Sequence, residues 1–288
     1  MSAVAAARTK ASAPSVATIT RLLGLILSLA AFVAIFGPLR RGAQSFSWRA
    51  GRRTPVWFHR LLCAGLGVTV RRSGAFDLAA SPLIVANHVS WLDILILGSL
   101  GPLSFLAKKE IGGHWLGREL VAMQGVVYVD RRRRSCIPAV NLRIAETLRA
   151  GSPVVLFAEA TTGDGNRMLA FRSSHFEPVC MLAKEPGGSG AVVQPVYLDY
   201  SRLAGLPLRR AERPRIAWYG DMTFLKHFFQ FCRSGRATCE VHIGAPIRIL
   251  PGTDRKSAAR LAEAAVRELA ANARKARSPF PSARKAPK

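Results

Sequence analysis

Acidic residues are scarce in this chain of 288 residues, which contains 17 Asp and Glu against 42 Lys and Arg and has a formal net charge of +25. Such an excess favours anionic partners, either nucleic acid or an anionic membrane, although a solvated basic surface accounts for part of it. The basic clusters are not interleaved with stacking aromatic residues, and no nucleic-acid-binding motif is present. We therefore expect membrane lipids as partners and no nucleic acid.

Cysteine is also sparse, and the five cysteines have neither the spacing of a metal site nor that of a disulfide framework. We expect them to be buried thiols in a reducing compartment. No cluster of His, Cys and acidic residues has ligand spacing, so we predict no metal site and no bound cofactor. The Gly-x-Gly-x-x-Gly and Gly-x-Ser-x-Gly patterns are also missing, which argues against a dinucleotide site and a serine nucleophile.

Long hydrophobic runs are limited to residues 22–39, which carry no charge and are just long enough to span a bilayer. The run ends at Arg40 and Arg41 instead of at a small-residue cleavage site, so we favour an uncleaved anchor over a signal peptide. We predict a disordered N-terminus over 1–19 and a membrane helix over 20–39. More basic residues follow this helix than precede it, which places the following domain in the cytoplasm. A shallow helix lying in the interface is the alternative.

From residue 54 onward the pattern alternates between short apolar runs and helical periodicity, which predicts an α/β domain over 54–273 with a layered mixed sheet flanked by helices. A basic tail covers 274–288. Pro55 is expected to open a helix over 56–66, either interfacial or packed on the domain. The predicted strands are 68–72, 83–86, 103–107, 126–129, 154–157, 191–198, 215–219 and 238–243. The other predicted helices are 91–100, 114–123, 138–150, 176–184, 224–232 and 257–273.

The segment Asn-His-Val-Ser-Trp-Leu-Asp over 87–93 joins His88 to Asp93 directly after an apolar run. A histidine oriented by a carboxylate can act as a general base. Residues five apart on an ideal helix lie about 140° apart, too far to meet easily. Ser90 and Asp93 match a capping box, with Ser90 at the N-cap, which leaves His88 in a strand-to-helix loop where it can fold back. Plain capping, with His88 as a bystander, is the alternative.

Three further segments follow in order: Gly-Val-Val-Tyr-Val-Asp-Arg over 125–131, Phe-Ala-Glu-Ala-Thr-Thr over 157–162, and Val-Gln-Pro-Val over 193–196. With the His88 segment, this series resembles the four blocks of the glycerolipid acyltransferase family, best known from lysophosphatidate (1-acylglycerol-3-phosphate) acyltransferases. Those blocks read Asn-His-x-x-x-x-Asp, Gly-x-x-Phe-x-x-Arg, Phe-Pro-Glu-Gly-Thr-Arg and Val-x-Pro-Val. The resemblance covers residues 54–250.

The resemblance implies transfer of an acyl group from acyl-CoA or acyl carrier protein to a lysolipid hydroxyl, at the cytoplasmic face of the bacterial inner membrane. His88 would be the base and Asp93 its orienting partner, with no cofactor. Arg131, Glu159 and Thr161 would bind the acceptor by block resemblance. Arg167 and Arg172 lie close enough downstream to replace an arginine that the third block lacks.

Three residues of the third block depart from the family pattern: Ala158 replaces Pro, Ala160 replaces Gly, and Thr162 replaces Arg. If the loop needs positive φ at Ala160, the alanine costs roughly 1 kcal/mol. The stretch Thr-Thr-Gly-Asp-Gly-Asn-Arg over 161–167, with Phe-Arg-Ser-Ser over 171–174, resembles a bacterial subgroup of this family that includes lyso-ornithine lipid acyltransferases. The acceptor of those enzymes has an amino-acid head group instead of a phosphate. Lysophosphatidate, which would give phosphatidic acid, is the first expectation and lyso-ornithine lipid the alternative. A further alternative is a non-catalytic, basic membrane-binding protein with a decayed site. The sequence leaves the oligomeric state open.

Overall fold

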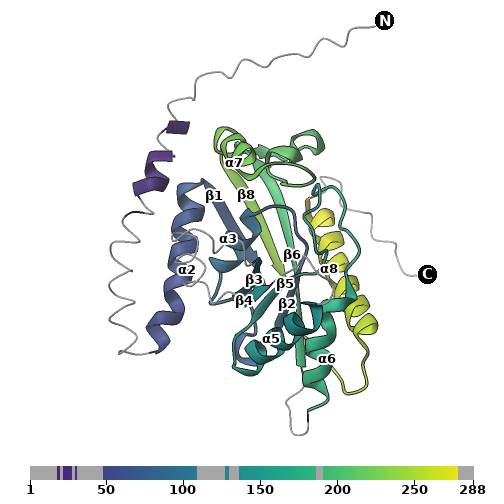
Figure 1. The fold of residues 1–288 in the computed structure, drawn as a ribbon. Helices are drawn as coiled ribbons and strands as arrows, with labels where there is room; N and C mark the ends of the chain where they lie inside the picture. Colours follow the sequence, from purple (N-terminus) through teal and green to yellow (C-terminus); the bar gives the residue numbers. More distant parts are fainter. Residues whose placement is uncertain are drawn as a thin grey trace, which may run out of the picture.

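A single mixed sheet forms the centre of the molecule, with helices on both sides (Figure 1). The computed structural model describes residues 18–19, 22–27, 30, 48–108, 127–129, 136–185 and 191–277. Within those residues the strands are β1 (Val68–Ser73), β2 (Leu83–Ala86), β3 (Ser104–Lys108), β4 (Val127–Val129), β5 (Val154–Phe157), β6 (Ala191–Leu203), β7 (Leu206–Pro207), β8 (Ala237–Ile243) and β9 (Ile247–Ile249). They are ordered β1-β8-β6-β2-β5-β3-β4, with β7 and β9 paired to β6.

The central strands β2 and β5 are short apolar runs that are buried on both faces, as parallel strands covered by two helical layers usually are. Successive side chains of a strand point to opposite faces. Leu83 and Val85 therefore join one hydrophobic cluster, and Ile84 and Ala86 join a second one on the other side of the sheet. The sheet separates two cores, as a three-layer α/β domain requires.

The helices divide between these two cores. The cluster around Leu83 includes residues of α5 (Ile137–Arg149), α6 (Glu177–Ala183) and α8 (Arg255–Arg277). The cluster around Ile84 includes residues of α2 (Trp48–Gly65), α3 (Leu92–Gly98) and α7 (Phe224–Arg233). Short 3-10 turns η1 (Leu78–Ala80), η4 (Ser173–Phe176) and η5 (Arg210–Arg215) complete the described elements. The predicted layered α/β architecture is confirmed.

The helix predicted after Pro55 is longer than expected, because α2 begins at Trp48 and contains Pro55 in its interior. Phe58 and His59 are each 1% exposed, so α2 packs on the domain through this face. Burial lowers the pKa of His59 to about 4, which is the behaviour of a core histidine. On the outer face, the guanidinium of Arg60 lies 5.2 Å from the ring centre of Trp57.

The strand predicted over 215–219 is wrong. Arg215 ends η5, and the next residues are not paired in the sheet. Ile216 and Ala217 are buried in the cluster around Ile84, so burial alone accounts for the apolar pattern. The backbone N–H of Trp218 donates to Val89 O at 2.9 Å instead of to a neighbouring strand, which ties this segment to the loop after β2.

The predicted membrane helix over 20–39 lies largely outside the described residues, as do the 1–19 segment, most of the 274–288 tail and the helix predicted over 114–123. None of the helices that the described residues form is both long and apolar enough to cross a bilayer. Four of the five cysteines are buried as expected, and Cys136 is half-buried.

Candidate active site

The carboxyl ends of three neighbouring strands meet at one edge of the sheet. Ala86 at the end of β2 pairs with Phe157 of β5 on one side and with Val196 of β6 on the other. His88 follows β2 by two residues, and Glu159 follows β5 by two residues, so parallel pairing brings both to the same edge. Crevices at this edge of α/β sheets are where ligands usually bind.

His88 and Asp93 are in direct contact, with 2.8 Å between His88 Nδ1 and Asp93 Oδ2. Asp93 is fully buried, and its Oδ2 also accepts the backbone N–H groups of Val89 at 2.6 Å and Ser90 at 2.9 Å. Its Oδ1 accepts the hydroxyl of Tyr200 at 2.6 Å. An ionised carboxylate only accepts hydrogen bonds, so His88 Nδ1 must be the donor. Nε2 of a neutral His88 is then the free basic atom.

The predicted capping box is only half present. Helix α3 begins at Leu92 with Trp91 at the N-cap, and no side chain caps it. The hydroxyl of Ser90 is buried, with no hydrogen-bond partner in the part of the chain that the structure describes. Asp93 reaches back to the N–H of Ser90, as in a capping box, but it also binds Val89 and His88. The carboxylate therefore closes the turn itself, and the serine hydroxyl is not needed.

Several contacts hold the imidazole in place. The ring of Phe157 stacks on His88 with centroids 3.9 Å apart and planes 11° apart. The carbonyl of His88 accepts the N–H of Gly163 at 2.8 Å. The side chain of Asn87 bonds to both the N–H and the carbonyl of Leu198, which prolongs the β2–β6 pairing past the end of β2. A base fixed in this way loses little freedom when it reacts.

Glu159 lies at the centre of the loops around His88. It is 4% exposed, and its two oxygens accept the backbone N–H groups of His88 at 3.2 Å and Leu169 at 3.1 Å. Burial raises the pKa of Glu159 to about 7, although these two hydrogen bonds and the positive charge of Arg267 act in the opposite direction. The structure thus places Glu159 beside the His88–Asp93 pair, where it joins the loop after β2 to the loop after β5.

The loop after β5 adopts the conformation that the sequence suggested. Ala160 has φ of 61°, in the left-handed region that alanine adopts only with strain. Ala158 is buried, and its carbonyl accepts the N–H of Arg172 at 2.8 Å. Ala160 therefore occupies a strained left-handed position directly after Glu159, which bonds to the N–H of His88.

Of the other predicted binding residues, some line the pocket at His88 and some do not. Arg167 lines a small pocket with His88 and Glu159. Thr161 and Arg172 are exposed and do not line that pocket. Arg131 lies outside the described residues.

Sequence reasoning missed two arginines at this pocket, Arg213 and Arg274. The pocket is about 20 Å³, little more than the space of one water molecule. Nη1 of Arg213 donates to Gly165 O at 2.6 Å and so fixes the loop after β5 from outside. Neither arginine belongs to a local motif, and both are far from His88 in the sequence. The sequence alone therefore did not indicate that they line this pocket.

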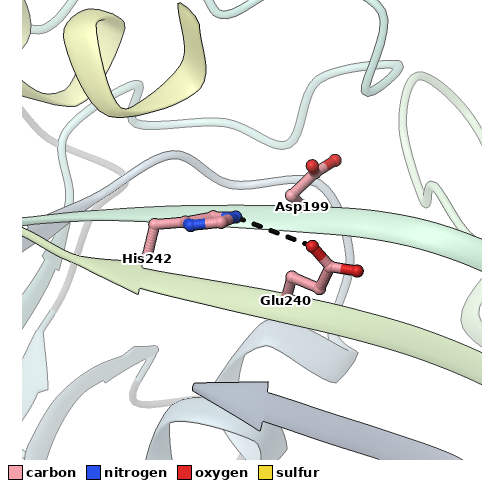
Figure 2. Close-up of side chains that lie close together, drawn as sticks. All are labelled: Asp199, Glu240 and His242. Atoms are coloured by element: carbon pink, nitrogen blue, oxygen red, sulfur yellow. Dashed lines mark ion pairs between the residues drawn. The ribbon is translucent and has the colours of Figure 1, made fainter. Parts of the chain in front are cut away.

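A second group of titratable side chains lies on β6 and β8, where the sequence indicated no ligand set (Figure 2). The ligand atoms of Asp199, Glu240 and His242 lie within 4.8 Å of one another. Asp199 and Glu240 are cross-strand partners, so sheet register brings together residues far apart in the chain. Nη2 of Arg277 lies 2.6 Å from Asp199 Oδ2, and His242 Nδ1 lies 3.0 Å from Ser73 Oγ. A guanidinium already supplies a cation to this group.

A family model described as Acyltransferase matches residues 68–199, the segment that contains the His88–Asp93 pair. A lyso-ornithine lipid O-acyltransferase from Brucella abortus is 36% identical over 251 residues, which cover 87% of this chain and 91% of that protein. A protein of the same name from Rhizobium meliloti is 30% identical and covers 89% of this chain and 87% of its own length.

A 1-acyl-sn-glycerol-3-phosphate acyltransferase from Neisseria gonorrhoeae is 35% identical over 143 residues, half of this chain and 52% of that protein. Among solved structures, a 1-acyl-sn-glycerophosphate acyltransferase from Thermotoga maritima superposes with a TM-score of 0.64 at 16% identity, covering 92% of this chain and all of the other. At that identity the superposition supports the fold alone.

Proposed function

The chain belongs to the acyltransferase family, and we propose that it transfers a fatty acyl group to the free hydroxyl of a lyso-ornithine lipid. It is an O-acyltransferase of the lysophospholipid acyltransferase type, which removes the alternative of a non-catalytic binding protein. One observation carries the choice of acceptor: relatives that span most of the chain are named lyso-ornithine lipid O-acyltransferases. The Neisseria relative named for 1-acylglycerol-3-phosphate matches only half of it.

The third block supports the same acceptor. Thr162 occupies the position where the family block has an arginine that would bind a phosphate. Threonine has no charged guanidinium and cannot form the bidentate hydrogen bonds that arginine forms with an anion. Of the two predicted substitutes, Arg172 is exposed and does not line the pocket at His88, whereas Arg167 does. Lysophosphatidate, our first expectation from the sequence, is therefore not better supported than lyso-ornithine lipid.

In the proposed reaction His88 is the general base and Asp93 its positioning partner. Asp93 holds the Nδ1–H, so His88 Nε2 takes the proton of the acceptor hydroxyl as its oxygen attacks the thioester carbonyl carbon. The tetrahedral intermediate then expels the thiolate, which takes the proton from His88. The developing imidazolium is stabilised by the buried carboxylate of Asp93. No enzyme nucleophile is needed, because a thiolate is a good leaving group.

The donor in this proposal is an acyl thioester of coenzyme A or of acyl carrier protein, and the enzyme works at a membrane surface. Support for the surface comes from α7, where Phe224, Leu225 and Phe229 are 47%, 66% and 45% exposed. Exposed apolar side chains next to basic ones favour a lipid interface, and Lys226 and Arg233 lie on the same helix.

Mass analysis of products tests the acceptor. The purified full-length enzyme is given acyl-CoA or acyl carrier protein with lyso-ornithine lipid, lysophosphatidate or other lysolipids. We expect free thiol and a doubly acylated ornithine lipid to form together, with His88→Ala as the inactive control. Turnover of lysophosphatidate with none of lyso-ornithine lipid would overturn the proposed acceptor and restore our first expectation.

A further inference from the structure

An arginine-rich cavity of about 520 Å³ lies next to the His88 pocket. Five guanidinium groups and one carboxylate line it, together with apolar and hydroxyl groups; the charged residues are Arg71, Arg202, Arg213, Glu240, Arg274 and Arg277. We call this space the arginine cavity. Its volume falls in the range of small-molecule sites, and its lining gives it a net positive charge.

Sheet register brings together two residues that line the arginine cavity, Arg71 and Glu240, and aligns them with the buried Asp199. Arg71 of β1 pairs with Glu240 of β8, which pairs with Asp199 of β6, so the three residues form one row across three strands. Figure 2 shows Asp199 and Glu240 on adjoining strands with the ring of His242 beside them. The row holds one guanidinium, that of Arg71, followed by two neighbouring carboxylates, of which Asp199 is buried.

Helix α8 provides one wall with Arg274 and Arg277. Asp199 is 1% exposed, and Arg277 Nη2 approaches its Oδ2 at 2.6 Å. That ion pair lacks the alignment of a hydrogen bond, and neither oxygen of Asp199 has an aligned donor among the described residues. Burial accordingly raises the pKa of Asp199, with the charge of Arg277 acting against the rise. Asp199 itself does not line the arginine cavity; it is a buried carboxylate beside Glu240, which does.

The arginine cavity adjoins the reacting centre. Arg213 and Arg274 line both this cavity and the small pocket that contains His88. Tyr200, which bonds to Asp93, directly follows Asp199 on β6, and the two side chains point to opposite faces of the strand. The two shared arginines therefore connect the place of the reacting hydroxyl at His88 to the arginine cavity.

We propose that the arginine cavity binds the head group of the acceptor, an amino acid with one carboxylate and one ammonium. This inference rests on the proposed lyso-ornithine acceptor and names the residues that would select it. Arg71 and Arg202 bind the carboxylate, because a guanidinium matches a carboxylate with two parallel hydrogen bonds. Glu240, which is partly exposed and lines the cavity, binds the ammonium.

The charges distinguish this occupant from a metal ion. Asp199, Glu240 and His242 are grouped closely enough to hold a cation, but Arg277 already lies at Asp199 and four more arginines line the space above. A divalent ion would face that positive field, whereas an anionic group is attracted by it. Glu240, the carboxylate that lines the arginine cavity, then offers a binding partner for an ammonium group.

Three acceptors and two variants test the inference. The acceptors are lyso-ornithine lipid, the same lipid with norvaline in place of ornithine, which lacks the side-chain amine, and lysophosphatidate. The variants are Arg71→Gln and Glu240→Gln, with Arg248→Gln as a matched control. Arg248 lies on β9, paired near the opposite end of β6 from the cavity. Thermal unfolding of each variant verifies that it is folded.

With Arg71→Gln we expect the KM for the ornithine and norvaline lipids to rise tenfold or more, while the KM for the thioester stays within twofold. With Glu240→Gln we expect the KM to rise for the ornithine lipid only. An unchanged acceptor KM in folded variants, or a rise in donor KM instead, would overturn the cavity assignment and leave the proposed acceptor standing. A wild-type enzyme that ignores both amino-acid lipids would overturn the proposed acceptor and the cavity assignment together.

Discussion

Among the described residues, His88 and His242 each lie beside a buried carboxylate, and the two groups differ in how that carboxylate is hydrogen-bonded. Asp93 is fully buried and accepts four hydrogen bonds, from two backbone N–H groups, one tyrosine hydroxyl and His88. Asp199 is 1% exposed and has one poorly aligned guanidinium contact, while His242 Nε2 is 4.0 Å from Glu240. The first group is saturated with hydrogen bonds, and the second reaches the arginine cavity through Glu240.

Proximity of a histidine and an acid is therefore not enough to make a base. Asp93 accepts four hydrogen bonds, and one of them holds Nδ1 of His88. The imidazole is therefore fixed in position with Nε2 free. In the second group Glu240 lines the arginine cavity and is partly exposed, so it is available to a ligand. Fixed hydrogen bonds favour catalysis because they need no reorganisation during the reaction, and open ones favour binding of a ligand.

The largest expected difference between the two groups is in turnover. His88→Ala should reduce kcat by 10²- to 10⁴-fold, because a positioned general base is removed. His242→Ala should leave kcat at saturating acceptor within about threefold. Thiol release from acyl-CoA in the presence of lyso-ornithine lipid measures both. A near-normal kcat in folded His88→Ala would show that the His88–Asp93 group is structural, and the two histidine groups would then not differ in catalysis.

Stability should separate the two aspartates. Asp93→Ala leaves buried N–H groups at Val89 and Ser90 and the hydroxyl of Tyr200 without their acceptor, and we expect a loss of about 3 kcal/mol in the free energy of unfolding. Asp199→Ala removes one ion pair with a partly exposed arginine, and we expect a change of about 1 kcal/mol or less. Chemical unfolding in detergent measures both. Equal losses would mean that Asp199 is as well satisfied as Asp93.

Glu159 lies next to the saturated group and should make stability depend on pH. Its folded-state pKa of about 7 is above the ordinary value of 4.5, so the folded chain holds the proton more tightly than the unfolded chain. The stability that protonated Glu159 contributes is complete below pH 4.5 and is lost as the pH rises toward 7. Between pH 5 and 8 the free energy of unfolding of the wild type should fall by about 1–3 kcal/mol more than that of Glu159→Gln.

The control for this pH effect is Glu146→Gln, since Glu146 is exposed on α5. That variant should keep the pH dependence of the wild type. If Glu159→Gln has the same pH dependence as the wild type, burial does not raise the pKa of Glu159.

The smallest expected effect is at Ala160, in the loop that holds Glu159. Its φ of 61° is strained for alanine, so Ala160→Gly should raise the free energy of unfolding by about 0.5–1 kcal/mol. Ala204, with φ of 52° in the turn after β6, is the matched control, and Ala204→Gly should give a similar gain. Thermal unfolding compares the two. A loss of stability in Ala160→Gly alone would show that the loop after β5 uses the methyl group in packing.

Sequence patterns predicted β2 and β5 to the residue, because buried parallel strands are continuous apolar runs. The His88–Asp93 contact was predictable because it is local, with both residues in one turn. The strand expected over 215–219 failed because burial without sheet pairing gives the same apolar pattern. Tyr200, Arg213 and the pairing of Asp199 with Glu240 could not be predicted, since each depends on strand order and register that one sequence does not encode locally.

The adjacency of Asp199 and Tyr200 on β6 limits how acceptor preference could be changed. Side chains alternate along a strand, so inserting or deleting one residue shortly before this pair would exchange the faces of both. Tyr200 would then leave Asp93, and Asp199 would leave Glu240 and Arg277, which line the arginine cavity. Length changes and segment grafts in β6 would thus damage both sites at once, whereas replacing single side chains can alter one and spare the other. Engineering of the acceptor range should therefore proceed by substitution at fixed length.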